Sequence, residues 1–155
     1  MERTLILVKP DGVQRGLAFD VLGRLERRGL KIVGLKLMLV SDDLASRQYA
    51  EHEGKSFYAG LIGYITSRPI VAAVFEGPNA IAAARATMGK TNPVQADAGT
   101  IRGDLGLDTG RNLVHGSDGS ESAEREINLF FRPEELRSYT REVDTWVVEL
   151  SLIHI

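Results

Sequence analysis

The sequence predicts an α/β sandwich, in which helices pack on a sheet with a β-α-β-β-α-β core and added helices. Three observations support this prediction. Apolar, β-branched runs of strand length alternate with segments that have helical spacing. The resulting order is strand, helix, strand, two helices, strand, helix, long loop, strand and helix. Hydrophobic residues form 43% of the 155 residues, which is enough to bury the core of one domain.

Each element follows from hydrophobic spacing and from the residues that interrupt it. The expected strands are residues 4–9, 30–40, 70–75 and 113–115. The expected helices are residues 17–28, 41–54, 56–67, 79–88 and 120–130, with a further helical turn at Glu134 and Glu135. Ser41 and Asn79 are expected to cap helices, and Gly29 suits the position after a helix end. Residues 10–12 are expected to form a loop, because proline, aspartate and glycine favour turns.

Composition narrows the classes of partner. The formal net charge is −2 and the isoelectric point is near 5.9, so the field of the whole molecule gives no reason to expect nucleic acid or an anionic membrane. The chain has no cysteine, which excludes disulfides, thiolate zinc sites and cysteine nucleophiles. No apolar run is long enough for a signal peptide or a membrane span, and a cytoplasmic protein is therefore expected.

Two motifs suggest sites but are better explained otherwise. Gly89-Lys90-Thr91 resembles the end of a Walker A phosphate loop, which also needs a preceding strand and a glycine where Ala84 stands. Residues 51–53, Glu-His-Glu, could suggest a metal site, but metal ligands normally come from more than one segment and no second cluster is evident. We interpret residues 51–53 as a solvated helix face.

Two basic residues occupy positions that are typical of sites. Lys9 ends a strand that looks buried, so its side chain points into a cleft or extends along the surface to solvent. Arg102 lies in residues 99–104, GTIRGD, within a segment from residue 89 to 111 that lacks periodicity. Glycines permit close approach and arginine can bind phosphate oxygens with two donors, although an ordinary surface turn explains Arg102 equally well.

His115 is the candidate nucleophile, in RNLVHGSD at residues 111–118. An isolated histidine is more often structural, but Gly116 would let a ligand approach, and Ser117, Asp118 and Glu126 offer hydrogen bonds. A neutral imidazole can act as a phosphate acceptor without losing a proton.

Asn112 and His115 present a geometrical difficulty. Strict strand alternation would send these two side chains to opposite faces of the sheet. If both line one pocket, the chain must bulge or turn between them.

Four segments together closely resemble the nucleoside diphosphate kinase family. They are KPDGVQRG at residues 9–16, KTNP at 90–93, GTIRGD at 99–104, and RNLVHGSD with ESAEREI at 111–127. The likeness covers about residues 2 to 149. It implies a ferredoxin-like α/β (α+β) sandwich with an antiparallel four-stranded sheet. It also implies ping-pong transfer of the γ-phosphate of a nucleoside triphosphate, typically ATP, to a nucleoside diphosphate through a phosphohistidine.

The resemblance implies a role for each residue that matches the motifs. The catalytic group would comprise His115 as phosphorylated nucleophile, Tyr49 beside it, Ser117 and Glu126 as a supporting hydrogen-bond pair, and Lys9 and Asn112 on the ribose hydroxyls. Lys9 would also reach the transferred phosphoryl group. The remaining contacts would be Phe57 on the base, Arg85, Thr91 and Arg102 on the phosphates, and Asp118 and Arg15 as braces.

The same resemblance implies the partners. Magnesium (Mg2+) would arrive on the nucleotide phosphates, without ligands from the protein. Stacking on one aromatic ring accepts any base, so ATP, GTP and other nucleoside tri- and diphosphates are expected as substrates. Neither nucleic acid nor a membrane is expected as a partner. Family members are hexamers or tetramers, and residues 91–101 resemble the loop that mediates trimer contacts, which favours a homo-hexamer.

The sequence leaves two other functions open. One is protein-directed phosphohistidine transfer, which would need His115 but not Phe57. The other is a non-catalytic ferredoxin-like binding module. We expect a single domain over residues 1–150, and residues 151–155 (SLIHI) could be a subunit contact, an ordered edge, or a cloning or sequence artefact.

Overall fold

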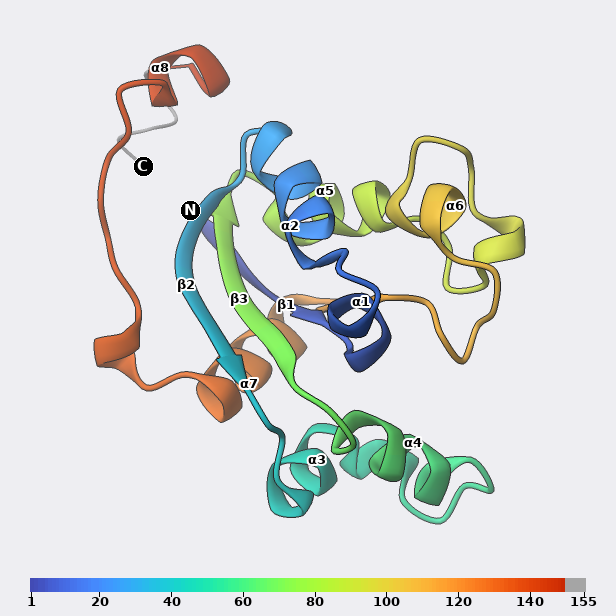
Figure 1. The fold of residues 1–155 in the computed structure, drawn as a ribbon. Coiled ribbons are helices and arrows are strands. Elements are labelled where there is room, and N and C mark those ends of the chain that lie inside the picture. The colour runs from blue at the N-terminus through green and yellow to red at the C-terminus, as the bar shows by residue number, and fades with distance from the viewer. Residues whose placement is uncertain (150–155) are drawn as a thin grey trace.

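The centre of the sheet is the apolar run that opens the sequence. β1 (Glu2–Val8) pairs antiparallel with β3 (Ile70–Gly77) on one side and with β4 (Val114–Gly116) on the other. β2 (Lys31–Met38) pairs antiparallel with β3, so the strand order is β2-β3-β1-β4. The computed structural model describes residues 1–149 (Figure 1) and confirms the expected ferredoxin-like core with an antiparallel four-stranded sheet.

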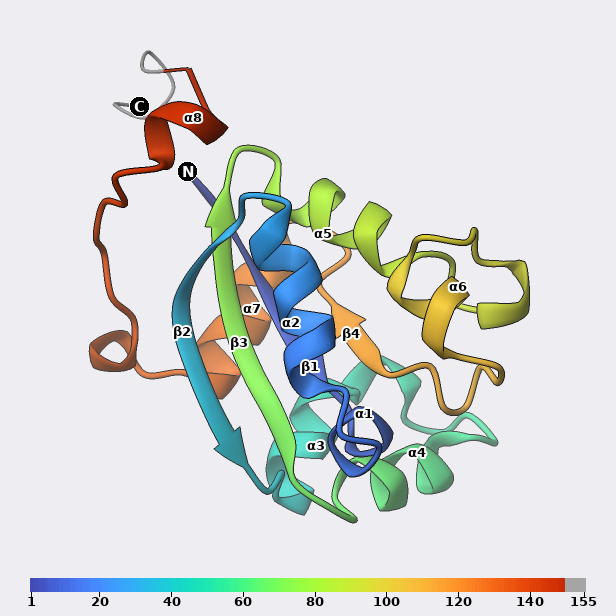
Figure 2. The same ribbon diagram turned by 45° about the horizontal axis from the view of Figure 1, so that its top comes forward.

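β1 is buried on both faces, which explains its lack of polar alternation. Ile6 and Val8 belong to a core shared with α2 (Ala18–Arg27) and α5 (Ala80–Met88), whereas Leu5 and Leu7 belong to a second core. α3 (Asp42–Gln48) and α7 (Ser120–Phe130) complete that second core. Successive side chains of a strand point to opposite faces, so one continuous apolar run supplies both cores. Figure 2 shows α2 and α7 on opposite faces of the sheet.

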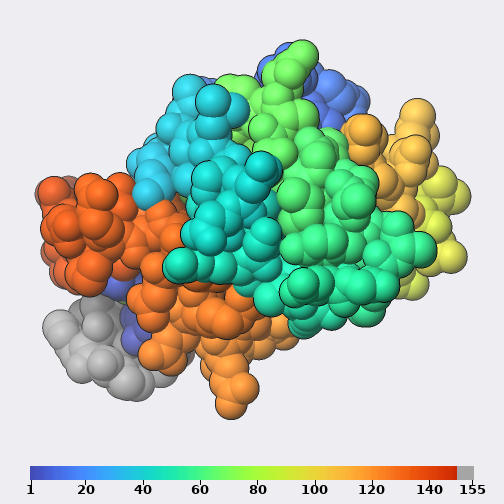
Figure 3. All heavy atoms as spheres, turned by 90° about the horizontal axis from the view of Figure 1, so that it is seen from below, coloured from blue at the N-terminus to red at the C-terminus, as the bar shows by residue number. Residues whose placement is uncertain are grey.

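The segment after β2 follows its predicted cap but not its predicted length. The Ser41 Oγ accepts the Leu44 N–H at 3.1 Å and so caps α3. The expected continuation of this helix to residue 54 is wrong, because Tyr49 leaves the helical conformation. The chain then forms the 3-10 turn η1 (Ala50–His52) and α4 (Tyr58–Ile65). Figure 3 shows the α3–α4 region, in teal and green, beside orange residues that include α7.

Two expectations about helix starts are wrong. Residues 10–12 form not a loop but the first part of α1 (Pro10–Gln14), because a proline at the first helical position has a suitable φ and leaves no N–H unpaired. Asn79 makes no side-chain cap on α5, and its own backbone is left-handed with φ 51°. The Glu2 carboxylate accepts the Ile81 N–H at 2.8 Å instead.

The long segment before β4 contains short elements that periodicity did not reveal. They are η2 (Pro93–Gln95) and α6 (Ile101–Leu105). The Asn92 and Thr100 side chains accept backbone N–H groups and begin these elements. A helix of one turn is too short to produce a hydrophobic period, so these caps are the signal that the sequence offers.

The carboxyl-terminal part of the described chain returns along the sheet. η3 (Pro133–Glu135) is the helical turn that the sequence predicts, and α8 (Asp144–Val147) was not expected. The Arg137 N–H donates to the Val33 carbonyl at 2.8 Å, which attaches this return to β2. Over residues 1–149, no helix is long and apolar enough to cross a membrane. The tail at residues 151–155, together with residue 150, lies outside the described residues.

Candidate active site

Most of the predicted site residues line one cavity of about 610 Å³. They come from the residue after β1, the segment between α3 and α4, α5, the segment before β4, β4 with the residues that follow it, and α7. The predicted residues in the lining are Lys9, Tyr49, Phe57, Arg85, Thr91, Arg102, Asn112, His115, Asp118 and Glu126. Ser117 lies behind this lining, fully buried, and Arg15 lies on α1's exposed end.

A turn at Leu113 allows Asn112 and His115 to line the same cavity. Leu113 has a φ of +75°, and the Val114 N–H donates to the Asn112 carbonyl at 2.8 Å. This three-residue hydrogen bond defines a γ-turn, and a γ-turn with positive φ is rare and strained. The turn required by the sequence pattern is therefore present, and β4 begins only after it, at Val114.

The Glu126 carboxylate fixes the ring of His115. Nε2 of His115 lies 3.1 Å from Oε2 of Glu126, whose side chain is only 5% exposed. Burial raises the pKa of Glu126, but hydrogen bonds from His115, Ser117 and Gln48 outweigh it and hold this pKa below its ordinary value. An ionised carboxylate only accepts hydrogen bonds, so the proton of neutral His115 belongs on Nε2 and Nδ1 keeps its lone pair.

Ser117 and Gln48 hold the Glu126 carboxylate in place. The Ser117 Oγ donates to Oε1 of Glu126 at 2.7 Å and accepts the Leu5 N–H at 3.1 Å. The Gln48 Nε2 donates to Oε2 at 2.8 Å, and the Gln48 side chain is buried with no partner for its Oε1 among the described residues. The sequence does not reveal this role of Gln48, because a polar residue near the end of a helix, here directly before Tyr49, is ordinary.

Lys9, Arg85 and Arg102 form a cationic region of the cavity. Burial, followed by the charge of Arg102, lowers the pKa of Lys9 to about 8. Burial, followed by the charge of Arg85, lowers the pKa of Arg102 to about 10. Each shift means that the charged form is held at a cost, which a bound anion would relieve. The cavity therefore concentrates positive charge where an anion could bind, on a chain whose formal net charge is −2.

Arg102 is also bound tightly to the backbone. Its side chain is 6% exposed, and it donates from Nε to the Asn112 carbonyl at 3.2 Å, from Nη1 to Gly89 at 3.0 Å and from Nη2 to Val114 at 2.6 Å. A guanidinium has five N–H donors, so two stay available for a ligand. Arg102 thus holds the backbone on both sides of the γ-turn, which the sequence did not predict.

Aromatic rings form the outer part of the cavity. Phe57, directly before α4, is 52% exposed, and its ring meets the ring of His52 edge-on with centroids 5.3 Å apart. An exposed aromatic ring at a cavity is a platform for a flat ligand. Of residues 51–53, interpreted as a solvated face, Glu51 and Glu53 are exposed and His52 is half-buried; Glu51 and His52 also line the cavity, which the sequence did not predict. Burial, followed by the charge of Glu126, raises the pKa of Tyr49 to about 12, so its hydroxyl keeps its proton.

The other predicted residues support the cavity wall. The Asn112 Nδ2 donates to the Thr91 carbonyl at 2.9 Å, and the Arg85 Nη1 donates to the Gly116 carbonyl at 3.2 Å. A Cβ at Gly116 would lie 2.5 Å from the Sδ of Met88, so the glycine allows close packing against α5. Gly116 also lines the cavity, where the sequence predicts that it lets a ligand approach.

The two predicted braces lie at different depths. Asp118 lines the cavity and accepts the hydroxyl proton of Ser122. The Arg15 Nη1 donates to the Leu105 carbonyl at 2.8 Å, at the end of α6. Arg15 thus braces the helix that carries Arg102 and does not face the cavity.

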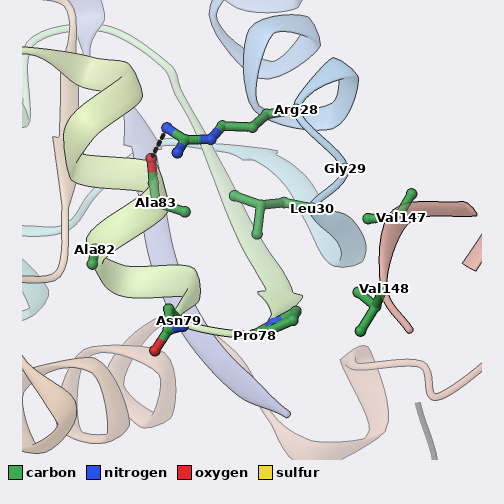
Figure 4. A pocket seen from close by; sticks show the side chains of 9 residues that line it. All are labelled: Arg28, Gly29, Leu30, Pro78, Asn79, Ala82, Ala83, Val147 and Val148. Carbon is green, nitrogen blue, oxygen red and sulfur yellow. Dashed lines mark hydrogen bonds between the residues drawn. The ribbon is translucent and has the colours of Figure 1, made fainter. Parts of the chain in front are cut away.

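A second cavity, of about 500 Å³, lies where the ends of α2 and α5 meet α8. Figure 4 shows Leu30, Val147 and Val148 in its wall, and the Arg28 guanidinium donating to the Ala83 carbonyl at 3.1 Å. This wall contains none of the residues that the sequence motifs single out, so it is not the site that they describe.

Comparison with known proteins agrees with this geometry. Residues 2–136 match the family model described as nucleoside diphosphate kinase. The chain is 59% identical over 149 residues to the nucleoside diphosphate kinase of Carboxydothermus hydrogenoformans, with 96% of this chain and 100% of the relative covered. It is 61% identical over 148 residues to that of Thermomicrobium roseum, with 96% and 99% covered.

A solved structure supports the same assignment. The nucleoside diphosphate kinase of Halobacterium salinarum in complex with CDP superposes with a TM-score of 0.93 at 51% identity, covering 96% of this chain and 99% of that one. The resemblance, the ferredoxin-like fold and the phosphotransferase activity between nucleotides that the motifs imply are therefore confirmed. The chain belongs to the nucleoside diphosphate kinase family.

Proposed function

We propose that His115 carries the phosphoryl group in this reaction, with Nδ1 as the attacking atom. The observation behind this assignment is the contact between Nε2 of His115 and Glu126, which leaves Nδ1 unprotonated at the cationic cavity. The imidazole can therefore attack without first losing a proton.

The two half-reactions then balance without proton transfer. In the first, the Nδ1 lone pair attacks the γ-phosphorus, an N–P bond forms, and the bond to the bridging oxygen breaks with its electron pair leaving on the diphosphate. In the second, an oxygen of the terminal phosphate of another nucleoside diphosphate attacks the same phosphorus. The N–P bond breaks and its electron pair returns to Nδ1. Nε2 keeps its proton throughout, hydrogen-bonded to Glu126.

The remaining roles follow from charge and shape. Lys9, Arg85 and Arg102 supply positive charge for the phosphates and for the transferred group, where phosphoryl transfer depends on positioning and electrostatics. The other assignments are Thr91 on phosphate, Lys9 and Asn112 on the ribose hydroxyls, Phe57 under the base, and Tyr49, Ser117 and Glu126 around His115. One exposed ring accepts any base face, so we infer that ATP, GTP and other nucleotides are interconverted.

Kinases of this family require a divalent metal, and we propose that it is Mg2+ bound to the nucleotide substrate. Lys9, Arg85 and Arg102 offer an ammonium and two guanidinium groups to the phosphates, and these groups suit anions rather than a cation. Of the carboxylates in the same lining, Asp118 and Glu126 already accept hydrogen bonds from Ser122 and Ser117. Among residues 1–149, no group of three or more histidines and carboxylates could hold an ion. Magnesium typically keeps several waters and is bound largely through substrate phosphates, as this arrangement requires.

We propose a second copy of this chain as protein partner, in a hexamer or a tetramer. β2 is an edge strand, and Leu35 and Leu37 on it are 48% and 68% exposed, while Leu39, directly after it, is 65% exposed. Exposed apolar edges promote strand pairing between chains, so a subunit interface would protect this one. A cytoplasmic location, the absence of nucleic-acid and membrane partners, and a single domain over residues 1–150 stay predictions.

Labelling with γ-³²P ATP and Mg2+, without acceptor, tests the assignment of His115. We expect label on the protein that is lost in acid, survives alkali and passes to an added nucleoside diphosphate. His115→Ala should take no label while still binding nucleotide, and His52→Ala, a histidine of the same cavity, should still be labelled. Label on His115→Ala, or transfer from the phosphoprotein to other proteins but not to nucleotides, would overturn the proposal.

A further inference from the structure

The γ-turn at Leu113 is strained, and its surroundings must hold it. Leu113 is not a glycine, yet it has a φ of +75°, and its side chain is fully buried. Such a conformation persists only where neighbouring groups over-determine it. Without the turn, Asn112 and His115 would point to opposite faces.

Both backbone groups of Leu113 are bound by the segment that follows β1. The Lys9 N–H donates to the Leu113 carbonyl at 2.8 Å, and the Leu113 N–H donates to Oδ2 of Asp11 at 3.1 Å. A Cβ on Gly12 would lie 3.1 Å from the Leu113 carbonyl oxygen and 2.7 Å from a methyl group of Val8. Glycine therefore lets α1 approach the turn closely enough for Asp11 to reach it.

The other oxygen of Asp11 connects the turn to α4. Oδ1 of Asp11 accepts the hydroxyl proton of Tyr64, on the last turn of α4. The Arg111 guanidinium lies 4.3 Å from the centre of the Tyr64 ring. Arg111 precedes the turn in the sequence, whereas His115 follows it. Asp11 therefore connects α4, which directly follows the exposed ring of Phe57, to the backbone of Leu113, two residues before His115.

We propose that Asp11 is a positioning residue for phosphorylation of His115, acting through the γ-turn at Leu113 and anchored by Tyr64. The proposal rests on the function assigned to His115 above. Asp11 does not line the cavity, so it reaches His115 through the backbone. Its charge also raises the pKa of Lys9, so the variants below are compared at pH 6, where Lys9 stays charged. Asn112 keeps its own anchors, because its carbonyl is bound by Arg102 and its amide by Thr91.

Single-turnover phosphorylation by Mg·ATP, alongside the Kd for ADP, tests this role. Asp11→Ala removes the carboxylate that accepts the Leu113 N–H. This change should slow phosphorylation of His115 by about 100-fold, a typical result of misplacing a reacting group by about 1 Å. The Kd for ADP should change by less than about threefold, because the nucleotide contacts remain. Tyr64→Phe removes only the anchor of Asp11 and should slow phosphorylation by less than about tenfold. Unchanged phosphorylation in both variants would overturn the proposal.

Free imidazole distinguishes positioning from general support of the fold. In His115→Gly, added imidazole can act as a nucleophile that the turn does not hold. Adding Asp11→Ala to that variant should leave the imidazole-dependent rate within about threefold, because a free nucleophile cannot be misplaced through the backbone. An equal loss in both backgrounds would show that Asp11 only supports folding or binding, and so would overturn the proposal.

Two outcomes separate this proposal from the function on which it rests. Phosphorylation of His115→Gly without imidazole would refute the assignment of His115 itself. If Asp11→Ala does not fold, Asp11→Asn keeps one oxygen acceptor and the size of the side chain, and should give a smaller loss of phosphorylation with the same ADP affinity. A loss of ADP affinity equal to the loss of rate in Asp11→Asn would contradict a positioning role.

Discussion

Nε2 of His115 lies 3.1 Å from Oε2 of Glu126, and the same carboxylate accepts hydrogen bonds from Ser117 and Gln48. Three donors around one nearly buried carboxylate keep it ionised and fixed in direction. The imidazole ring therefore has one orientation and one neutral tautomer before any nucleotide arrives. Phosphoryl transfer benefits from such preorganisation, because the protein contributes mainly position and charge.

Replacing Glu126 by glutamine should slow catalysis moderately. The amide oxygen of Glu126→Gln can still accept from one neighbour, but its NH₂ group would face the donor atoms of Gln48 or Ser117. Losing one charge-assisted hydrogen bond costs about 1.5 kcal/mol, which corresponds to about a tenfold lower kcat. Steady-state kinetics should show this decrease with little change in KM. An increase in KM alone would contradict a role behind the nucleophile.

Glu126 should also contribute to the pH dependence of stability. Its pKa is held below the ordinary glutamate value in the folded protein, so the folded state favours the ionised form. The resulting stabilisation is complete above the unfolded pKa and is lost as pH falls through the depressed folded pKa. Urea unfolding should therefore show a larger difference in free energy between wild type and Glu126→Gln at pH 7 than near pH 3. A difference that stays constant with pH would contradict this.

Lys9 should give nucleotide binding a pH dependence on the alkaline side. Burial and the neighbouring Arg102 lower its pKa to about 8 in the free protein, and only the charged form attracts phosphate. We expect kcat/KM to fall above about pH 8, and kcat to fall less because bound phosphates favour the charged lysine. Lys9→Arg provides the control. A guanidinium stays charged at this pH, so the kcat/KM of Lys9→Arg should show no decrease near pH 8. A profile of kcat/KM that is flat to pH 10 would refute this role for Lys9.

The same pKa predicts a cost in stability. Lys9 is charged at pH 7 although the folded protein disfavours that charge, so stability should rise as pH increases from about 8 toward the unfolded value of 10.5. Lys9→Met should therefore raise the Tm at pH 7 while weakening nucleotide binding. This is the stability that the site gives up for function. A lower Tm in Lys9→Met would show instead that the packing of Lys9 dominates.

The sheet and its main helices could be predicted because their signals are local and strong. The apolar run of β1 and the Ser41 cap are visible in a short stretch of sequence, and the structure places both as expected. α1 and α6, of five residues each, could not be recognised by period, and the cap of α5 comes from Glu2, far away in the sequence. Local patterns cannot reveal a cap that tertiary structure supplies.

The site was predictable to the extent that motifs mark it. The segment around His115 identified the nucleophile, and alternation showed that a turn must precede it. The residues that hold this arrangement could not be identified, since Gln48, Asp11 and Tyr64 act through contacts that span 53 to 102 residues of chain. The double role of Arg102 was likewise hidden, because its partners are backbone carbonyls.

Arg102→Lys should be far from conservative. A lysine keeps the charge but cannot donate to the Asn112, Gly89 and Val114 carbonyls together. At least one of these buried acceptors should lose its partner, at a cost on the order of 2 kcal/mol in the free energy of unfolding. Phosphorylation should fall more than nucleotide affinity, because the γ-turn loosens while a cation stays in the cavity. Arg85→Lys, at a more exposed arginine of the same cavity, is the matched control and should lose less stability.

The edge of β2 should determine the assembly. Leu37 is 68% exposed on a strand whose outer side pairs with no other described strand, so a glutamate there would place charge in any interface that covers this edge. In sedimentation experiments at micromolar concentration we expect the wild-type chain to form a hexamer or tetramer and Leu37→Glu to form a smaller species with unchanged secondary structure. Trp146→Glu, at an exposed apolar residue on α8, is the control and should leave the assembly intact. A wild-type monomer would refute the proposed oligomer, and an unchanged mass for Leu37→Glu would place the interface away from this edge.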